Sequence, residues 1–428
     1  MKRHPATYKQ CAAVACLLAG CTAAAQQLPV ASPESVGLSS ERLARISAAV
    51  ERSIAEKRIA GAVTLVARRG HVAWLKAQGM MDREAGKPMD ADALFRICSM
   101  SKPITTLAAM MLYEEGKFLL DDPVSKYIPE FKNPKVLVKP ASGPPYTIPA
   151  SREITIRNLM THTSGLTYHW NADLGQMYRD ANVAHGLLAY DGTIGDNVKR
   201  LAGLPLLFNP GDRFEYSLGV DVLGYLIEVL SGKPLDEFFR ARIFEPLDMR
   251  DTYFYPPEDK VKRLATAYTW YPENGLNRFP DTPIVEGAFS YSADYPYHGP
   301  KKLFAGGAGL CSTAMDYARF CQMMLDGGKA GGTRLISRKT VELMTTDRLG
   351  KIGPDQSFGL GFGIDGVKTP LAELGSPGEY NWGGFFYTAF VIDPKEQMIT
   401  IFMAQLHPTG DLTLDRLIHV LAYQAITD

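Results

Sequence analysis

Strand-like segments at both ends of the chain limit its fold more than any other feature. Residues 61–79 hold two runs of β-branched and apolar residues around Arg69-Gly70, a pattern typical of a hairpin. Helical patterns fill most of the chain after this hairpin. Because the other β-rich runs lie near the C-terminus, we expect one antiparallel sheet built from both ends of the chain. Those later strands are predicted over residues 358–364, 385–393 and 397–406.

Apolar residues recur at helical spacing in most of the intervening segments. Ser39 is a candidate N-cap for a helix over residues 39–57, in which Leu43, Ile46 and Val50 share one face. Further helices are predicted over residues 107–116, 154–160, 220–232, 235–247, 312–325 and 412–428. The Pro-, Gly- and Tyr-rich stretches predict long irregular loops, over residues 139–149 and 289–300.

The predicted fold class is α+β, in the form of an α/β sandwich. Its antiparallel sheet comes from both chain ends and is flanked by helices, and a mainly helical region is inserted between them. We expect the α/β part over about residues 33–105 and 305–428, and the helical part over about 106–304. Together they form a single unit over residues 28–428.

The first residues have the composition of a secretory signal, predicted over residues 1–27. A basic start is followed by a short apolar run with small residues at its end. This run is too short to span a bilayer, which takes roughly 20 apolar residues. One interpretation is ordinary signal cleavage after Ala25. The favoured one treats Leu18-Ala19-Gly20-Cys21 as a lipobox, which leaves Cys21 lipidated. We therefore expect an exported bacterial protein, either periplasmic or anchored to the membrane as a lipoprotein.

Charge and cysteine content exclude several classes of function. Lys+Arg and Asp+Glu both number 46, so the net charge is zero and no nucleic-acid partner is expected. The three cysteines beyond the signal segment, Cys98, Cys311 and Cys321, are predicted to be buried apolar residues rather than a disulfide framework. No CxxC, HExxH or EF-hand pattern occurs, so we expect no metal site and no cofactor.

Ser99 and Lys102 form the candidate reactive pair, in the stretch "RICSMSKPIT". A serine and a lysine three residues apart occur by chance in a chain of this length, so the surroundings must support the pair. Side chains at i and i+3 share a helix face, and Pro103 places the pair in the first helical turn. Neighbouring apolar residues predict burial, which disfavours a charged amine. A neutral Lys102 amine can then take the proton of Ser99.

A Ser–His–Asp hydrolase is the main alternative enzyme class. The GxSxG turn that carries the serine of α/β-hydrolases does not occur in the chain. His162, in "THTSGL", is predicted to have a structural role. His407, just after the last predicted strand, is interpreted as a loop histidine that could border the site.

Several motifs in one order resemble those of a known superfamily. They are "CSMSKPIT", "LMTHTSGL" at 159–166, "NPGDRFEYSLGVDVLGYLIEVLSGKPL" at 209–235 and "GGAGLCSTAMDYARF" at 306–320. Together they resemble the serine β-lactamase and penicillin-binding-protein superfamily, in its class C β-lactamase-like branch. The resemblance runs from about residue 33 to the C-terminus. It implies a β-lactamase/transpeptidase-like fold, in which Ser99 is the nucleophile and Lys102 its proton acceptor.

The resemblance also implies a tyrosine and a glycine-bearing strand beside the serine. Tyr216 matches the tyrosine of the superfamily's Tyr-x-Asn motif, and Leu218 replaces its asparagine. The Lys-Thr-Gly position is occupied by Trp382-Gly383-Gly384, which removes a carboxylate-binding cation and provides an aromatic wall. By analogy, the oxyanion hole consists of the backbone N–H groups of two residues, Ser99 and Phe385. Leu218 and the glycine-bearing strand Trp382-Gly383-Gly384 are substrate-binding candidates. Two further candidates, His169 and Trp170, lie with Tyr168 near the expected site entrance.

These departures favour one branch of activity over others. Trp-Gly-Gly with Tyr-Ser-Leu resembles the family VIII bacterial carboxylesterases and related acyltransferases. The predicted function is therefore a serine hydrolase that acts through an acyl-enzyme on small neutral esters. Its expected partner is a small-molecule ester or amide substrate. The alternatives are a β-lactamase or D-Ala-D-Ala carboxypeptidase, an acyltransferase, and a catalytically idle peptide-binding relative.

Overall fold

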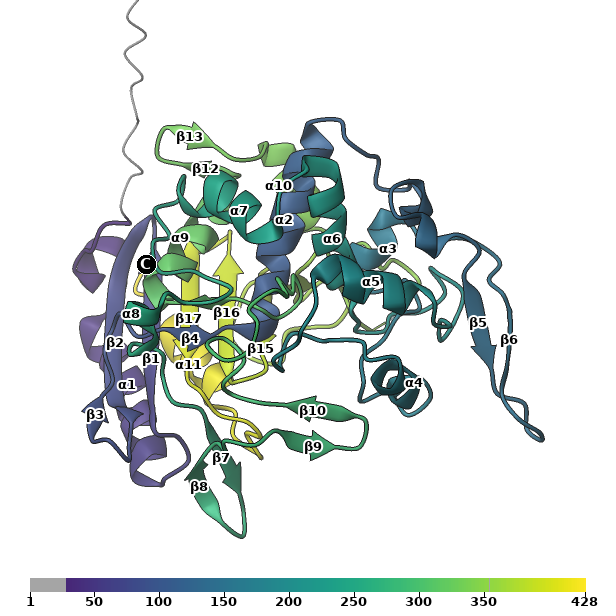
Figure 1. Ribbon diagram of the computed structural model, residues 1–428. Helices are drawn as coiled ribbons and strands as arrows, with labels where there is room; N and C mark the ends of the chain where they lie inside the picture. Colours follow the sequence, from purple (N-terminus) through teal and green to yellow (C-terminus); the bar gives the residue numbers. More distant parts are fainter. Residues whose placement is uncertain (1–27, 354) are drawn as a thin grey trace, which may run out of the picture.

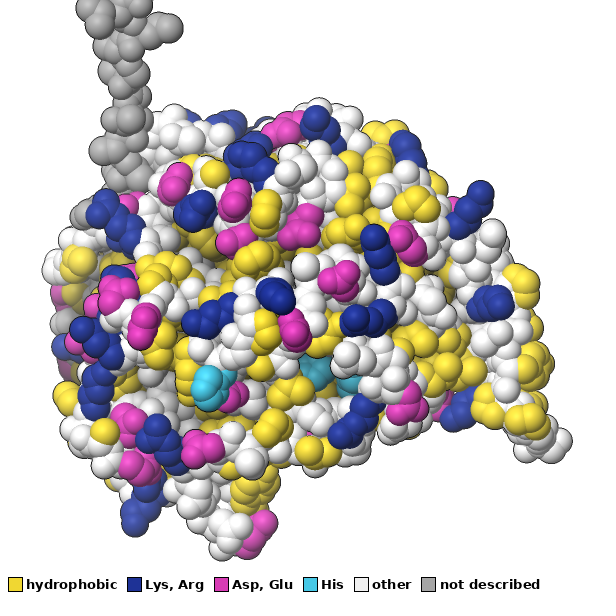
Figure 2. All heavy atoms as spheres, in the orientation of Figure 1, with side chains coloured by type: hydrophobic (Ala, Val, Ile, Leu, Met, Phe, Trp, Pro, Cys, Tyr) yellow, Lys and Arg dark blue, Asp and Glu magenta, His cyan; other side chains and the backbone are white. Residues whose placement is uncertain are grey.

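A computed structural model describes residues 28–353 and 355–428 of the protein (Figure 1). The predicted signal segment, with Cys21, lies outside the described residues. Within the two described ranges, no helix combines the length and apolar character needed to cross a membrane. Basic and acidic side chains are interspersed on the face shown in Figure 2.

One seven-stranded sheet joins the two ends of the chain, as the sequence predicts. Its strands lie in the order β14-β15-β16-β17-β1-β2-β3, and every neighbouring pair is antiparallel. The contact between the two chain ends is the pairing of β1 with β17, in which Leu65 lies opposite Ile401. The bounds are β1 (Gly61–Arg68), β2 (His71–Asp82), β3 (Lys87–Pro88), β14 (Gly363–Ile364), β15 (Tyr380–Gly384), β16 (Thr388–Asp393) and β17 (Met398–Met403).

Helices cover both faces of this sheet and confirm the predicted α/β sandwich. Helices α1 (Ser40–Ala55) and α11 (Leu414–Tyr423) pack on each other and on one face. Helix α9 (Ala314–Leu325) packs on the other face, against β1 and β17. The Ser39 side chain caps α1 by accepting the Arg42 N–H at 3.2 Å, as its sequence predicts.

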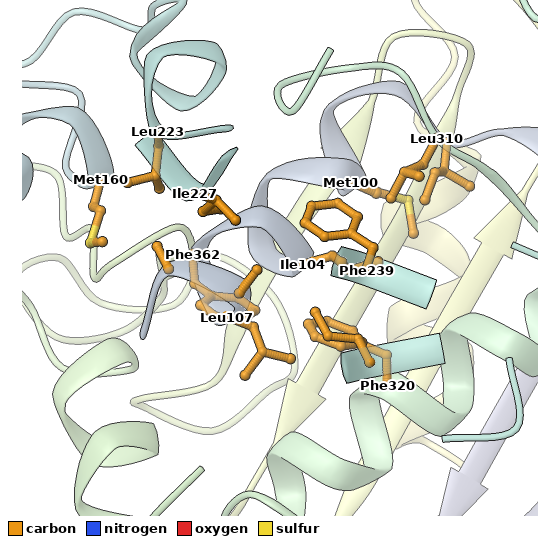
Figure 3. Close-up of a cluster of buried hydrophobic side chains, with 14 of the residues drawn as sticks. Met100, Ile104, Leu107, Met160, Leu223, Ile227, Phe239, Leu310, Phe320 and Phe362 are labelled. Carbon is orange, nitrogen blue, oxygen red and sulfur yellow. The ribbon is translucent and has the colours of Figure 1, made fainter. Parts of the chain in front are cut away.

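The central helix α2 (Ser101–Glu114) is buried along almost its whole length. Figure 3 shows its Ile104 and Leu107 among side chains from many other segments. They pack against α6 (Gly219–Ser231), which lies beside α2. Because full burial of one such side chain stabilises the fold by about 1.5–3 kcal/mol, this packing holds the start of α2 in a fixed place. The cluster also includes Met100, Met160, Leu223, Ile227, Phe239, Leu310, Phe320 and Phe362.

Shorter elements surround this core. The remaining helices are α3 (Ile156–Met160), α4 (Gly175–Asp180), α5 (Ile194–Ala202), α7 (Leu235–Phe239), α8 (Glu258–Val261) and α10 (Arg338–Met344). The 3₁₀ turns are η1 (Pro33–Val36), η2 (Cys98–Met100), η3 (Val124–Lys126) and η4 (Pro129–Phe131), and a π turn, η5 (Arg240–Phe244), follows α7. The small sheets contain β4 (Phe95–Arg96), β5 (Lys135–Val138), β6 (Tyr146–Pro149), β7 (Tyr268–Tyr271), β8 (Gly275–Arg278), β9 (Ile284–Glu286), β10 (Phe289–Tyr291), β11 (Cys311–Ser312), β12 (Lys329–Ala330) and β13 (Thr333–Arg334).

Two predicted loops and the bounds of two predicted strands differ from the structure. The predicted loops at 139–149 and 289–300 contain strands β6 and β10, because their Pro and Gly residues are concentrated outside the paired residues. The predicted strand at 358–364 is reduced to β14, because Gly361, with φ +85°, breaks the extended conformation. The predicted strand at 385–393 begins only at Thr388, after a turn in which Tyr387 has φ +63°.

The cysteine prediction is confirmed within the described residues. Cys98, Cys311 and Cys321 are all buried and none forms a disulfide. Burial raises the pKa of the Cys98 thiol to about 11, which keeps it protonated and unreactive at neutral pH.

Candidate active site

The start of α2 brings Ser99 and Lys102 together. Ser99 lies in the turn η2, and α2 begins two residues later at Ser101. Cys98, the first residue of η2 and just before the serine, has φ +45°, a left-handed conformation that is uncommon outside glycine. Pro103 is the third residue of α2, where its missing N–H costs no helical hydrogen bond. The structure therefore places the pair at the helix start, as predicted from the sequence.

The Ser99 hydroxyl has two functional side chains as neighbours. Its Oγ accepts a hydrogen bond from the Tyr216 hydroxyl at 2.7 Å and lies 3.3 Å from Lys102 Nζ. Tyr216 precedes α6 and is 117 residues from Ser99 in the chain. The three side chains named from the motifs therefore meet at one point.

Lys102 is buried and has three hydrogen-bond partners. Besides Ser99 Oγ, its Nζ donates to the Tyr168 hydroxyl at 3.0 Å and to the Gly307 carbonyl at 2.7 Å. An ammonium group needs three acceptors, which these three oxygens provide. A neutral amine donates only two hydrogen bonds, to Tyr168 and Gly307, and then offers its lone pair to the Ser99 hydroxyl. The same partners therefore serve both protonation states, and a proton can move without rearrangement.

Aromatic rings enclose Tyr216. Its ring centroid lies 5.4 Å from that of Tyr168 and 5.6 Å from that of Trp382. Lys102 Nζ lies 4.5 Å from the centre of the Tyr216 ring, within cation–π range. These contacts fix the ring plane and so direct the phenol oxygen toward Ser99.

His162 contacts Tyr216 and the backbone of the next residue. Its Nδ1 accepts the Ser217 N–H at 3.2 Å, and its ring lies 4.7 Å from that of Tyr216. Burial, together with the nearby charge of Lys102, lowers the pKa of His162 well below its usual value, so the ring is neutral. His162 thus holds the chain around Tyr216, which agrees with its predicted structural role.

Strand β15 approaches the serine from the other side. An added Cβ at Gly384 would clash with Ile97 O, in the segment that leads to Ser99, and with Thr388 Oγ1. Glycine is therefore required at this approach. Phe385 follows directly, and its ring stacks on His407 at 3.7 Å while its carbonyl lies 3.1 Å from His407 Nδ1.

The backbone at Phe385 is held in place with its N–H unused. Burial lowers the pKa of His407 to about 4, so the neutral ring can donate Nδ1–H to the Phe385 carbonyl. Among the described residues, the Phe385 N–H donates to no protein acceptor. This leaves it available to a substrate oxygen. His407, interpreted from the sequence as a loop histidine, thus borders the site.

The predicted substrate-binding residues have different surroundings. Trp382 and Gly383 lie at the partly exposed edge of β15, and Trp382 packs edge-on against Phe358. Trp170 is 48% exposed and stacks on Tyr168 at 4.3 Å, so it can meet a substrate beside the reaction centre. These positions fit an aromatic wall next to Ser99.

Two other candidates are buried side chains. His169 is buried, and its Nε2 donates to the Val183 carbonyl at 2.9 Å. Leu218 is fully buried in the main core and has no exposed surface. Both side chains are buried, and their role in direct substrate binding stays a prediction.

Two partners of Lys102, Tyr168 and Gly307, and the nearby Asp221 were not identified as its neighbours from the sequence. Tyr168 was expected only at the site entrance, and Gly307 and Asp221 were given no role. Asp221 had a visible signal, since it is an acidic residue in the otherwise apolar run "VDVLGYLIEVL". Gly307 contributes only backbone groups, which leave no trace in the sequence.

Comparisons with known proteins place the chain in a family. The Beta-lactamase family model matches residues 46–424. Protein Rv1367c of Mycobacterium tuberculosis is 36% identical over 373 residues, covering 83% of this chain and 88% of that protein. Esterase EstB of Burkholderia gladioli is 33% identical over 366 residues, covering 82% of this chain and 87% of that protein. The structure of EstCE1, a hydrolase with promiscuous acyltransferase activity, matches with a TM-score of 0.77 and 29% identity over 91% of this chain and 99% of its own. The chain therefore belongs to the Beta-lactamase family of serine hydrolases.

Proposed function

We propose that this protein is a carboxylesterase that cleaves small neutral esters through an acyl-enzyme on Ser99. The observation that carries the proposal is the position of Ser99 Oγ, 2.7 Å from the Tyr216 hydroxyl and 3.3 Å from Lys102 Nζ. These distances lie within reach of proton transfer between a nucleophile and its base.

In acylation, Ser99 Oγ forms a bond to the ester carbonyl carbon while its proton moves to Lys102 Nζ. The carbonyl π electrons move onto the oxygen, which the N–H groups of Ser99 and Phe385 stabilise. Such donors each contribute about 3 kcal/mol to acyl transfer. When the tetrahedral intermediate collapses, the alkoxide leaves and takes the proton back from Lys102 through the Tyr216 hydroxyl.

Deacylation uses the same groups in reverse. Water adds to the acyl carbonyl carbon and gives one proton, through Tyr216, to Lys102. The second tetrahedral intermediate then releases the carboxylic acid, and Ser99 Oγ recovers its proton from Lys102. The sum is one ester and one water consumed, and one acid and one alcohol formed.

The residue at position 382 supports an ester rather than a β-lactam substrate. Trp382 stands where relatives with a Lys-Thr-Gly strand have a cation, so the site lacks that partner for a substrate carboxylate. Trp170 and Trp382 instead offer aromatic surface to neutral groups. The 33% identity to an esterase over most of the chain supports the same substrate class.

The test compares Ser99→Ala with the parent protein on p-nitrophenyl butyrate, nitrocefin and a D-Ala-D-Ala peptide. We expect ester hydrolysis to be the fastest reaction and Ser99→Ala to abolish it while the circular dichroism spectrum is unchanged. Ser101→Ala is the matched control, because Ser101 Oγ accepts the Leu310 N–H at 3.1 Å and does not face the reaction centre. It should keep most of the activity.

Other outcomes identify the alternatives. Full activity in Ser99→Ala would refute the nucleophile assignment. Nitrocefin hydrolysis much faster than ester hydrolysis would identify a β-lactamase. Labelling of Ser99 by a fluorophosphonate without any turnover would identify a binding protein, and ester products formed with added alcohols would identify an acyltransferase.

A further inference from the structure

A second buried ionisable side chain lies close to Lys102. Asp221, in the first turn of α6, is 2% exposed. Its Oδ1 accepts the Gly307 N–H at 3.3 Å, and within the described residues its Oδ2 has no hydrogen-bond partner. An ionised carboxylate in such a place is costly unless an opposite charge compensates it.

Gly307 connects this carboxylate to Lys102. Its N–H faces Asp221 Oδ1, and its carbonyl accepts Lys102 Nζ at 2.7 Å. The positive end of one backbone dipole therefore faces the carboxylate, and the negative end of the next faces the amine. A Cβ at residue 307 would lie 2.5 Å from Asp221 Oδ2, so only glycine allows this close approach.

The charged and titratable groups around Asp221 are few. Lys102, on α2, lowers the pKa of Asp221 when its amine is protonated, and Tyr168, from the loop beside α6, is the neighbouring phenol. The loop at residues 305–309 brings only backbone groups. Burial raises the pKa of Asp221 to about 6, against the opposing effect of Lys102. Above this pH the carboxyl group is ionised, and below it the group is neutral.

We propose that Asp221 is a positioning residue that balances the positive charge on Lys102 as the amine takes the Ser99 proton, with Gly307 as the link between them. This inference rests on the proposed function. In the acylation step, the Ser99 proton converts a neutral amine into an ammonium, while negative charge goes to the substrate oxygen. Asp221 stabilises that ammonium, as the aspartate of a Ser–His–Asp triad stabilises its imidazolium.

The test measures the rate of Ser99 labelling by a fluorophosphonate in Asp221→Asn and in the parent protein, from pH 5 to pH 8. At pH 8 we expect the variant to react about 10-fold to 100-fold more slowly, because the carboxylate is missing when Lys102 becomes charged. At pH 5 the parent carboxyl group is itself neutral, so the two rates should converge to within about 2-fold. A purely structural Asp221 would give the same ratio at every pH.

Two controls separate charge from hydrogen bonding and from folding. Tyr168→Phe removes a neutral partner of Lys102, so its effect on the rate should not depend on pH in this range. Asp316→Asn removes another buried carboxyl group, on α9, and should lower the melting temperature with little effect on labelling per folded molecule.

Labelling reports on the folded fraction alone, and Asp221→Ser is a second neutral variant if Asp221→Asn does not fold. A ratio that is constant with pH in both variants would overturn the inference. Failure of the parent protein to be labelled at Ser99 would instead refute the proposed function, so the two failures are distinguishable.

Discussion

The two sides of the candidate site are built by different kinds of contact. On one side, Ser99, Lys102 and Tyr216 are joined by hydrogen bonds of 2.7 and 3.3 Å, with the amine buried. On the other side, Trp382 is held by ring packing against Tyr216 and Phe358 in the partly exposed strand β15. Hydrogen bonds fix direction, whereas apolar packing tolerates replacement by residues of similar size.

The difference indicates which side can vary without loss of the chemistry. The first side must keep its hydrogen-bond donors and acceptors, because the loss of one interrupts proton transfer from Ser99. The second side presents apolar surface to a substrate, so a change there alters which substrate binds. The resemblance in sequence follows this division: Ser99, Lys102 and Tyr216 match the motifs of the superfamily, whereas Trp382 differs from them.

The largest effect is expected on the hydrogen-bonded side, from Lys102→Met and Tyr216→Phe. Each removes a group that moves the Ser99 proton, so kcat for p-nitrophenyl butyrate should fall roughly 10²-fold or more. Lys102→Met also removes a buried amine and keeps a side chain of similar length. Because this change also removes the cation near the buried Asp221 carboxyl group, the melting temperature of Lys102→Met should fall.

The melting temperature distinguishes a loss of proton transfer from a loss of folded protein. Tyr216→Phe retains the ring contacts with Tyr168 and Trp382 and loses only the hydroxyl. A large loss of kcat is expected for both variants, together with an unchanged melting temperature for Tyr216→Phe. If either variant kept more than about a tenth of the activity, its residue would not be the proton carrier described above.

A smaller effect is expected where β15 meets the nucleophile turn, from Gly384→Ala. The added methyl group would clash with Ile97 O and Thr388 Oγ1, so the end of the strand and the Phe385 N–H must shift. We expect about a 10-fold loss of kcat, with little change in KM, since one oxyanion donor is displaced rather than removed. Steady-state kinetics on the same ester measure this.

Gly383→Ala is the matched control one residue earlier. Its Cβ would lie 3.3 Å from Thr388 O, which a small shift relieves, so activity should stay within about 2-fold of the parent value. Equal losses in both variants would show that β15 as a whole, rather than its approach to Ile97, is sensitive to added volume.

The sheet, the main helices and the Ser99–Lys102 pair could be predicted from the sequence because they leave local patterns. The Ser39 cap, the buried face of α1 and the strands β1 and β17 all follow from spacing within a few residues. The strand expected at 358–364 was wrong because a single left-handed glycine outweighs an apolar pattern.

The remaining parts of the site depend on contacts between distant segments. Lys102 meets Tyr168 across 66 residues and Gly307 across 205, and no spacing rule relates such positions in one sequence. Tyr216 and Trp382 were assigned only through the family resemblance. The partner of the Asp221 carboxylate could not be predicted either, because it is a backbone N–H, which every residue except proline carries.

The smallest effect is expected on the packed side, from Trp382→Ala. Its ring contributes contacts with Tyr216 and Phe358, and comparable aromatic contacts stabilise a complex by about 0.5–1.5 kcal/mol. KM for p-nitrophenyl butyrate should therefore rise about 3-fold to 10-fold, with kcat changed by less than about 3-fold, because the hydrogen-bonded side is untouched. Trp382→Leu keeps part of the apolar volume, so its KM should lie between those of the parent protein and Trp382→Ala. A loss of kcat as large as that of Tyr216→Phe would contradict the division of the site into a chemical side and a binding side, since Trp382 would then be holding the phenol in place.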